Sequence, residues 1–237
     1  MKADGQMILV HDTYHLAGGT LDDFEEDFWE EVIPALRKVE GVKPLWLLRQ
    51  RTGVEGEVAV ALTAVRSGAD LGGFTKWQSQ ARGRTGLTLS HARKALVAAP
   101  WSPLTDWDEV ASIESTGADD GPRVFMEDTG WPSAALSDYV DFQRREYWEP
   151  LQQWAASGGL LKLWGFFVVA FGTGHRPEAL FLQEVLDLRA LERLVSEPEE
   201  YDPDTFPGSY MVHGLQYRDQ WRSRLLVLSR PRSATHV

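Results

Sequence analysis

Val10-His11-Asp12-Thr13-Tyr14 closes a short apolar run and has a weaker echo in Met126-Glu127-Asp128-Thr129-Gly130. Each stretch is followed by a turn of small residues and then by a helix-like segment, which opens at Leu21 in the first case and at Leu136 in the second. The two aspartates lie 116 residues apart and the helix openings 115, close to half of the 237 residues. Anchors that recur in the same order at nearly the same distance indicate an internal duplication.

Both copies have the same predicted order of elements, β-α-β-β-α-β. In the first copy the strands are 7–15, 42–51, 57–66 and 108–115, and the helical regions begin at 21 and cover 70–98. In the second copy the strands are 123–129, 160–171, 178–186 and 223–229, and the helical pieces are 135–155, 187–196 and 207–219. Proline 34 falls inside the first helix, so a kink or an early end is expected there.

This order predicts an α+β fold of two tandem ferredoxin-like βαββαβ repeats. The segment 117–122 is small, polar and turn-rich, which is typical of a linker. We therefore place the first repeat at 1–116 and the second at 123–237.

Composition excludes several classes of function. The net charge of −11 disfavours nucleic acid and anionic membranes, which both need a basic surface. The chain has no cysteine, which excludes disulfides, thiolate nucleophiles and cysteine-ligated metals. Neither a signal-like segment nor a membrane-length apolar run stands out, so a soluble, cytoplasmic protein is expected.

The run 13–24, the strand at Pro44-Leu45-Trp46 and the glycine-bearing hairpin after it resemble the NIPSNAP family. That family belongs to the dimeric α+β barrel superfamily, whose members place two four-stranded sheets face to face around a cavity. A tandem chain can supply both sheets. The resemblance implies a choice among cofactor-independent monooxygenases, polyketide cyclases, small lyases and isomerases, and haem enzymes such as chlorite dismutase; the fold does not decide among them.

Alternate residues of a strand share one face, so Asp12 and Tyr14 point the same way. The NIPSNAP-like pattern places them on the cavity side, with Asp128 related to Asp12 by the repeat. Two carboxylates in an apolar cavity repel each other, which raises at least one pKa and provides a catalytic acid or base near neutral pH. The alternative is that both aspartates bond nearby backbone at the strand ends.

If the sheet is turned over, His11 and Glu127 face the cavity instead, as an acid–base pair or as a structural hydrogen bond. Trp46 and Trp164 hold equivalent strand positions and would line the cavity with aromatic surface for a planar ligand, unless they are plain core.

No metal site is expected, because His11 and His15 are about 13 Å apart along a strand and cannot grip one ion. Haem remains a minority alternative, with His213 as the axial candidate.

These observations favour a cofactor-independent enzyme of specialised metabolism. It would carry out acid–base chemistry, as a cyclase, isomerase or lyase, on a small apolar, aromatic or polyketide-like molecule. The catalytic candidates are Asp12, Asp128, Tyr14, His11 and Glu127, and the substrate-binding candidates are Trp46 and Trp164. The alternatives are a cofactor-free monooxygenase that uses O2, a haem-binding protein, and a ligand-binding barrel without catalysis. The substrate and the oligomeric state, including a homodimer, stay open.

Overall fold

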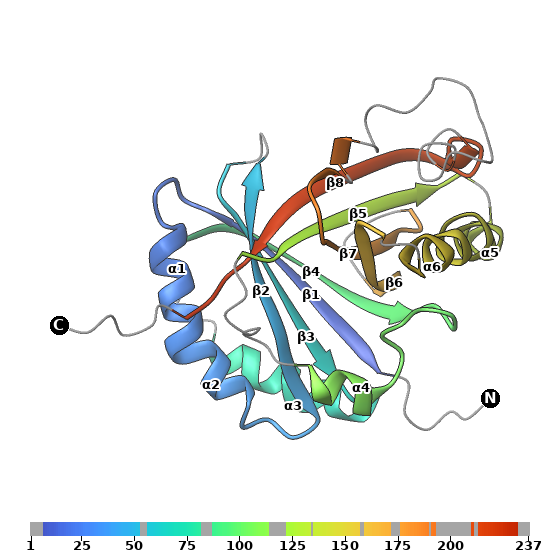
Figure 1. The fold of residues 1–237 in the computed structure, drawn as a ribbon. Helices are drawn as coiled ribbons and strands as arrows, with labels where there is room; N and C mark the ends of the chain where they lie inside the picture. Colours follow the sequence, from blue (N-terminus) through green and yellow to red (C-terminus); the bar gives the residue numbers. More distant parts are fainter. Residues whose placement is uncertain are drawn as a thin grey trace.

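Within the part of the chain that the structure describes, eight antiparallel strands close into one barrel in this computed structural model (Figure 1). The described residues are 7–52, 56–81, 87–113, 122–133, 135–156, 159–171, 176–189, 191–192, 210 and 213–231. The strands are β1 (Ile8–Leu16), β2 (Val42–Thr52), β3 (Val58–Val65), β4 (Thr88–Ala98), β5 (Val124–Pro132), β6 (Leu161–Phe171), β7 (Ala179–Val185) and β8 (Arg218–Leu228). The helical segments are α1 (Leu21–Asp27), η1 (Phe28–Val32), α2 (Ile33–Leu36), α3 (Gly68–Ala81), α4 (Trp107–Ser112), α5 (Leu136–Gln143), η2 (Arg144–Trp148) and α6 (Glu149–Ala156).

Each half of the barrel is a four-stranded sheet with the same strand order. The first sheet is ordered β4-β1-β3-β2 and the second β8-β5-β7-β6, and the two join where β2 pairs with β8 and β4 with β6. The predicted α+β architecture, two ferredoxin-like repeats in a barrel of the dimeric α+β type, is thereby confirmed. The boundaries 1–116 and 123–237 remain predictions, because residues 114–121, with most of the expected linker, lie outside the described part.

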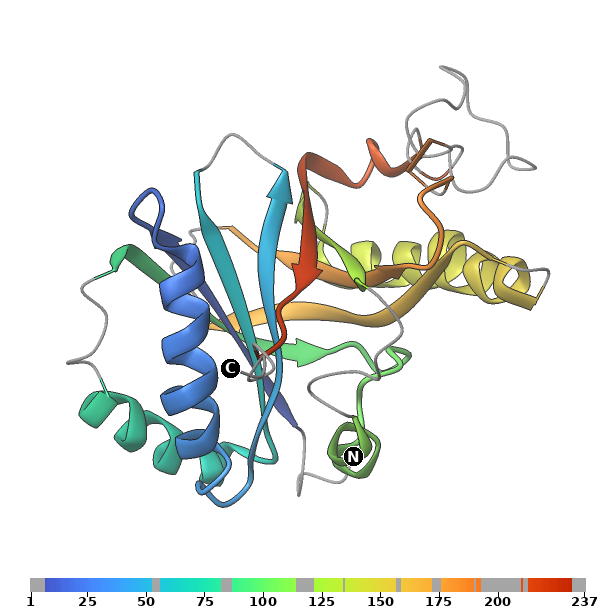
Figure 2. The ribbon, with the colours of Figure 1, turned by 60° about the vertical axis from the view of Figure 1, so that its left-hand side comes forward.

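Helices cover the outer face of each sheet (Figure 1, Figure 2). The segment α1-η1-α2 packs Phe24 and Phe28 against the first sheet, and α5-η2-α6 packs Phe142 and Tyr147 against the second. Figure 2 shows the two helical layers on opposite sides of the barrel. None of the helices among the described residues is long and apolar enough to cross a membrane.

A widened helical turn occurs at the same place in both repeats. The N–H of Ile33 donates to the carbonyl of Phe28, and the N–H of Glu149 donates to that of Arg144, so each bond spans five residues. Proline follows directly in both cases, at 34 and 150, and a proline removes a helical donor and crowds the preceding turn. The helix therefore widens at the position where we expected a kink or an end, and the repeat offset is 116.

Two predicted elements are wrong. The fourth strand of the first repeat is β4, inside the region 70–98 that we expected to be helical, and the predicted strand 108–115 is instead helix α4, capped by the Asp106 side chain. The last strand begins at Arg218 and not at 223. The sequence of β4 is rich in alanine, lysine and arginine, which favour helix, but pairing with β1 and β6 overrides that propensity.

The space between the two sheets is filled by side chains. Trp46, Phe125 and Phe167 belong to one apolar cluster there, together with inward leucines and valines of both sheets. The open inter-sheet cavity that the resemblance implied is therefore a packed core among the described residues. The pocket that the structure does contain lies elsewhere.

Candidate functional site

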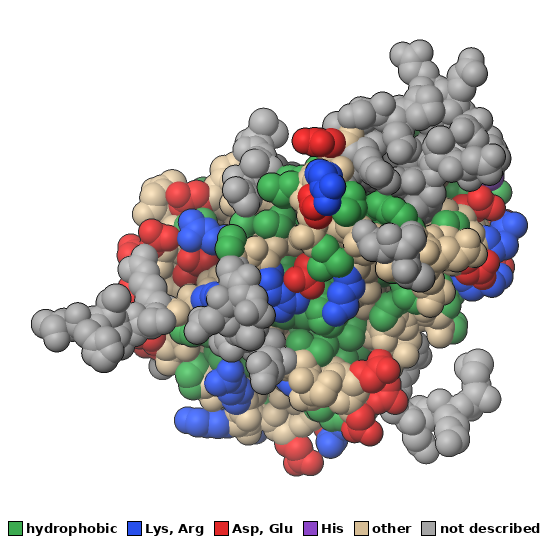
Figure 3. Space-filling view, in the orientation of Figure 1, with side chains coloured by type: hydrophobic (Ala, Val, Ile, Leu, Met, Phe, Trp, Pro, Cys, Tyr) green, Lys and Arg blue, Asp and Glu red, His purple; other side chains and the backbone are tan. Residues whose placement is uncertain are grey.

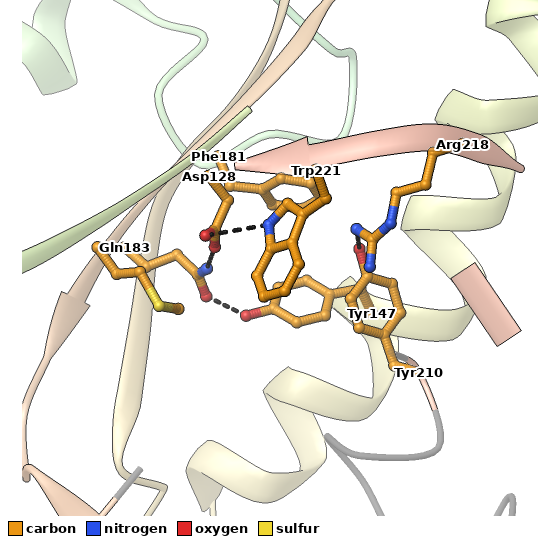
Figure 4. A pocket seen from close by; sticks show the side chains of 8 residues that line it. Asp128, Tyr147, Phe181, Gln183, Tyr210, Arg218 and Trp221 are labelled. Carbon is orange, nitrogen blue, oxygen red and sulfur yellow. Dashed lines mark hydrogen bonds between the residues drawn. The ribbon is translucent and has the colours of Figure 1, made fainter. Parts of the chain in front are cut away.

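The candidate site is a pocket on the outer face of the second sheet, beneath η2 (Figure 4). The empty space among its lining residues is about 300 Å³, a figure that includes open solvent in front of the pocket. The strands β5, β7 and β8 and the helical layer supply its lining residues: Met126, Asp128, Tyr147, Phe181, Gln183, Tyr210, Arg218 and Trp221.

Asp128 is the carboxyl group of the pocket, and its hydrogen-bond donors among the described residues are neutral groups. Gln183 Nε2 donates to Oδ2 over 2.8 Å, Trp221 Nε1 to Oδ1 over 3.3 Å, and the Ser223 hydroxyl also to Oδ1. Burial raises the pKa of this carboxyl to about 6, although these hydrogen bonds and the charge of Arg218 act to lower it. Asp128 can therefore both give and accept a proton near neutral pH.

Strand alternation and one glycine place Asp128 here. Met126, Asp128 and Gly130 share the face of β5 that turns toward the helices. A Cβ on Gly130 would collide with the hydroxyl of Tyr139 from α5, so only glycine lets this helix approach so closely. The pocket forms beside this close contact.

Two tyrosines and a glutamine extend the hydrogen-bond network. The Tyr147 hydroxyl donates to Gln183 Oε1, which orients the amide so that its nitrogen faces Asp128 (Figure 4). The Tyr210 hydroxyl donates to Gln143 Oε1 over 2.7 Å. Burial raises the pKa of both tyrosines well above the usual value, so both stay neutral. Tyr147 belongs to the widened turn η2, and such turns are frequent at functional sites.

Arg218 supplies a positive charge to the pocket. Its Nη1 donates to the Tyr210 hydroxyl over 3.4 Å, and its guanidinium lies 5.5 Å from the Tyr210 ring and 5.2 Å from the Trp221 ring. The residue is 4% exposed, whereas Trp221 is 41% exposed and forms the outer wall. Figure 4 shows Trp221 between Arg218 and Asp128.

The predicted orientation of Asp12 and Tyr14 is wrong. Tyr14 packs against Phe24 and stacks on His91, so this face of β1 turns toward the helices and not toward the inter-sheet space. Arg93 holds Asp12 with two hydrogen bonds of 2.6 and 2.9 Å. Both faces of β1 are largely buried, so alternation alone does not tell which of them meets the helices. The structure does not bring Asp12 into the pocket of Asp128.

The reversed orientation is the one observed. His11 Nε2 lies 2.7 Å from Glu127 Oε2 across the barrel interior, and the side chains are 2% and 1% exposed. Although burial acts to raise it, His11 and Arg224 hold the pKa of Glu127 at about 2, so this residue is a carboxylate at neutral pH. The pair connects the two repeats through the packed core, and its catalytic role stays a prediction.

Trp46 and Trp164 both turn into the core between the sheets. Their rings lie 5.0 Å apart, edge to face, and Trp46 also contacts Phe125 at 5.5 Å. They fill the space that they were expected to line, and neither belongs to the lining of the described pocket.

Most residues of the pocket were not predicted from the sequence. They are Met126, Tyr147, Phe181, Gln183, Tyr210, Arg218 and Trp221. One available signal was the alternation in β8, where Trp221 and Ser223 share a face and Arg222 and Arg224 share the other. Because the predicted strand began at 223, Trp221 and Arg222 lay outside it and this alternation was not recognised.

The described residues do not fit a haem. His213 lies outside the pocket lining; its ring packs edge-on against Phe142 at 5.3 Å, and its Nδ1 lies 3.8 Å from Glu146 Oε2. Phe142 in turn stacks on Tyr217 at 4.2 Å, and both rings lie edge-on to the His213 ring. The pocket itself is too small for a porphyrin. Among the described residues, no three histidine or acidic side chains gather into a metal site.

Solved structures of the same fold have diverse names. A candidate monooxygenase from Fusobacterium nucleatum has a TM-score of 0.63 at 8% identity, over 96% of this chain and 94% of its own. An anthrone oxidase-like protein has a TM-score of 0.59 at 11% identity, over 100% and 97%. Chlorite dismutase from Candidatus Nitrospira defluvii has a TM-score of 0.56 at 10% identity, over 94% and 91%.

A NIPSNAP family protein from Agrobacterium tumefaciens covers only 41% of this chain, at 20% identity and a TM-score of 0.36, so the finer resemblance to that family carries no argument. Neither a protein-family profile nor a curated protein sequence matches the chain. At these low identities the likeness is one of fold: the chain has the dimeric α+β barrel fold.

Proposed function

We propose that the protein is a small-molecule enzyme that moves a proton with Asp128. The observation that carries the proposal is a buried carboxyl, with its pKa raised to about 6, in a pocket that also holds a guanidinium and neutral phenols. Strongly shifted groups that meet in a pocket are typical of active sites, because an acid or base works best near the ambient pH.

The chemistry we propose begins when the ionised Asp128 removes a proton from a carbon next to a carbonyl. The substrate becomes an enolate, the positive charge of Arg218 stabilises its oxygen, and the protonated Asp128 returns the proton at the same or another carbon. This sequence serves an isomerase, a cyclase or a lyase and needs no cofactor. The aromatic lining favours a small aromatic substrate or a compact polyketide-like one.

The second candidate is a cofactor-free monooxygenase. Two neighbours with TM-scores of 0.63 and 0.59 are named as a candidate monooxygenase and an anthrone oxidase-like protein. Here the same carbanion would give its electrons to O2 and, with a proton, form a hydroperoxide in place of the carbon–hydrogen bond. Loss of water from that hydroperoxide would leave a carbonyl group, with one oxygen atom in the product and the other in water. The two candidates share the base Asp128 and differ in O2 uptake, which an oxygen electrode measures with a phenolic substrate.

Proton exchange tests the step that both candidates share. We expect the wild-type protein to exchange the acidic C–H of β-tetralone for deuterium in D2O, followed by NMR, with a rate that rises with pH through about 6. Asp128→Asn should lower that rate at least about 10²-fold. The matched control is Asp141→Asn, because the Asp141 side chain is 69% exposed. Equal rates in wild type and Asp128→Asn would exclude Asp128 as the base.

On the face in Figure 3, the described acidic and basic side chains are interspersed with apolar ones.

A further inference from the structure

We propose that Tyr147 is a positioning residue for the base Asp128. Its hydroxyl holds the side-chain amide of Gln183 in the orientation that offers an N–H to Asp128, and this orientation favours the ionised carboxylate over the neutral acid (Figure 4). Tyr147 thus acts through Gln183 and not by contact with the reacting atoms. The inference rests on the proposed function in taking Asp128 as the group that accepts the proton.

The first argument is the difference between the two ends of a side-chain amide. Its oxygen accepts hydrogen bonds and its nitrogen donates them, and a half-turn about the last bond exchanges the two with little change of shape. The Tyr147 hydroxyl donates to Gln183 Oε1, and Gln183 Nε2 donates to Asp128 Oδ2 over 2.8 Å. Because burial raises the pKa of Tyr147 well above its usual value, the hydroxyl keeps its proton and remains a donor to the amide oxygen.

The second argument is the place of Gln183 on the carboxyl group. Oδ1 of Asp128 accepts hydrogen bonds from Ser223 and Trp221, whereas the donor to Oδ2 among the described residues is Gln183. Each carboxylate oxygen has two lone pairs, so Oδ2 keeps one for the proton of a substrate. The amide of Gln183 therefore contacts the oxygen that we expect to react.

The third argument is what a turned amide would do. If Gln183 presented its oxygen to Asp128, an ionised carboxylate would face a second acceptor with no proton between them, whereas the neutral acid could donate to that oxygen. The turned amide would thus stabilise the acid, and the observed one stabilises the base. In agreement, the hydrogen bond from Gln183 acts to lower the pKa of Asp128 against the effect of burial.

Packing holds the Tyr147 ring independently of its hydroxyl. Phe181 meets this ring edge to face with centroids 5.2 Å apart, and Tyr210 lies 4.7 Å away. Tyr147 and Gln183 are both buried. Tyr147→Phe therefore removes the hydroxyl, keeps the ring among its neighbours and leaves the amide free to turn.

The charged and titratable groups that face Asp128 determine how the change is observed. They are Arg218 from β8, Tyr139 from α5, Tyr147 from η2, and Tyr210. The guanidinium stays charged and the phenols stay neutral between about pH 5 and about pH 8, so Asp128 is the member of this group that titrates there. In Tyr147→Phe the neutral acid gains an acceptor, and we therefore expect the pKa of Asp128 to rise.

A carbon-13 NMR titration of the Asp128 carboxyl, assigned with Asp128→Asn, tests the inference. We expect the midpoint at about pH 6 in wild type and about one unit higher in Tyr147→Phe. Deuterium exchange into β-tetralone should then be about tenfold slower at pH 5 and should reach the wild-type rate at high pH, whereas a general loss of structure would lower the rate at every pH. Tyr217→Phe is the matched control and should leave the midpoint unchanged, because Tyr217 stacks on Phe142 outside the pocket lining.

Gln183→Met shows whether Tyr147 acts through the amide. Loss of the donor should also raise the midpoint, and the addition of Tyr147→Phe to this variant should shift it no further. A wild-type midpoint in either single variant, or an equal shift by Tyr147→Phe with and without Gln183, would overturn the inference. If the midpoints move as expected while Asp128→Asn exchanges deuterium at the wild-type rate, the link through Gln183 stands and the proposed function fails.

Discussion

Asp12 and Asp128 hold the same position in the two repeats, and their surroundings make them different groups. Asp12 is bound by the guanidinium of Arg93 through both oxygens and lies 2.7 Å from His91 Nε2. Asp128 receives its hydrogen bonds from the amide of Gln183, the indole of Trp221 and the hydroxyl of Ser223. Asp12 is thus paired with a guanidinium, whereas Asp128 has neutral hydrogen-bond donors and burial raises its pKa to about 6. The partners, and not the repeated residue, distinguish the two copies.

The residue two positions further on completes this contrast. Tyr14 in the first repeat packs its ring against Phe24 and His91 and fills the space under the helix. Gly130 in the second repeat has no side chain, and the Tyr139 hydroxyl approaches it from α5. In the first repeat, a tyrosine of the strand fills the space between strand and helix. In the second repeat, a tyrosine of the helix reaches the strand at a glycine, and the pocket lies beside this contact.

The largest effect that we expect from the difference between the two aspartates is on the pH dependence of the free energy of unfolding. The pKa of Asp128 is about 6 in the folded chain against an ordinary value of 3.8. Between these two values the folded chain holds a proton that the unfolded chain has lost, so stability falls as pH rises through this window and is flat above it. We expect this loss to total about 3 kcal/mol.

Urea unfolding of wild type and Asp128→Asn, compared from about pH 4 to about pH 7, measures this contribution, because other carboxyl groups cancel in the difference. A difference in the free energy of unfolding that stays constant over that range would show that the pKa of Asp128 is not raised.

Removal of Arg93 tests the other side of the contrast. Arg93→Met keeps the apolar stem and leaves Asp12, with a side chain 5% exposed, without its guanidinium. We expect a loss of about 2 kcal/mol in urea unfolding, below the usual cost of breaking a buried pair because the Arg93 side chain is 32% exposed. Arg49→Met is the control, because that arginine is 40% exposed and its surface ion pairs contribute about 0–1 kcal/mol. Equal losses of unfolding free energy in the two variants would show that the pairing of Arg93 with Asp12 does not stabilise the fold.

The smallest effect concerns the glycine. Gly130→Ala places a methyl group against the Tyr139 hydroxyl and should cost about 1–2 kcal/mol in thermal or urea unfolding, because the packed helix must shift. Gly18→Ala is the control, because no atom lies within 4 Å of the added carbon there. If Gly130→Ala is as stable as Gly18→Ala, the close approach of α5 does not depend on the glycine.

The repeat and the barrel could be predicted from the sequence because they depend on periodic features. The Asp-Thr pairs at 12 and 128 and the helix openings at 21 and 136 recur at nearly the same offset, and such an offset survives substitutions elsewhere. Strand β4 was mistaken for helix because its alanines, lysine and arginine prefer helix when they are considered alone.

The site was predicted only in part, for a physical reason. Asp128 was among the predicted candidates. Both faces of its strand are buried, and the alternation of residues shows which of them share a face but not which face meets the helices. Tyr147, Gln183 and Arg218 come from three separate elements and meet only through tertiary packing. The spacing of these residues along the sequence follows no regular pattern from which their proximity could be predicted.

The histidine–glutamate contact between the sheets has a consequence for how halves of this kind recognise each other. Positions 11 and 127 are equivalent in the duplication, yet one carries His11 and the other Glu127, 2.7 Å apart. Were two copies of the first half to close on each other, an imidazole would oppose an imidazole, and two copies of the second half would oppose two carboxylates in a dry interior. Pairing of a first half with a second half is therefore favoured at this position over pairing of two identical halves. Divergence of positions 11 and 127 thus contributes to the specificity with which the two halves associate.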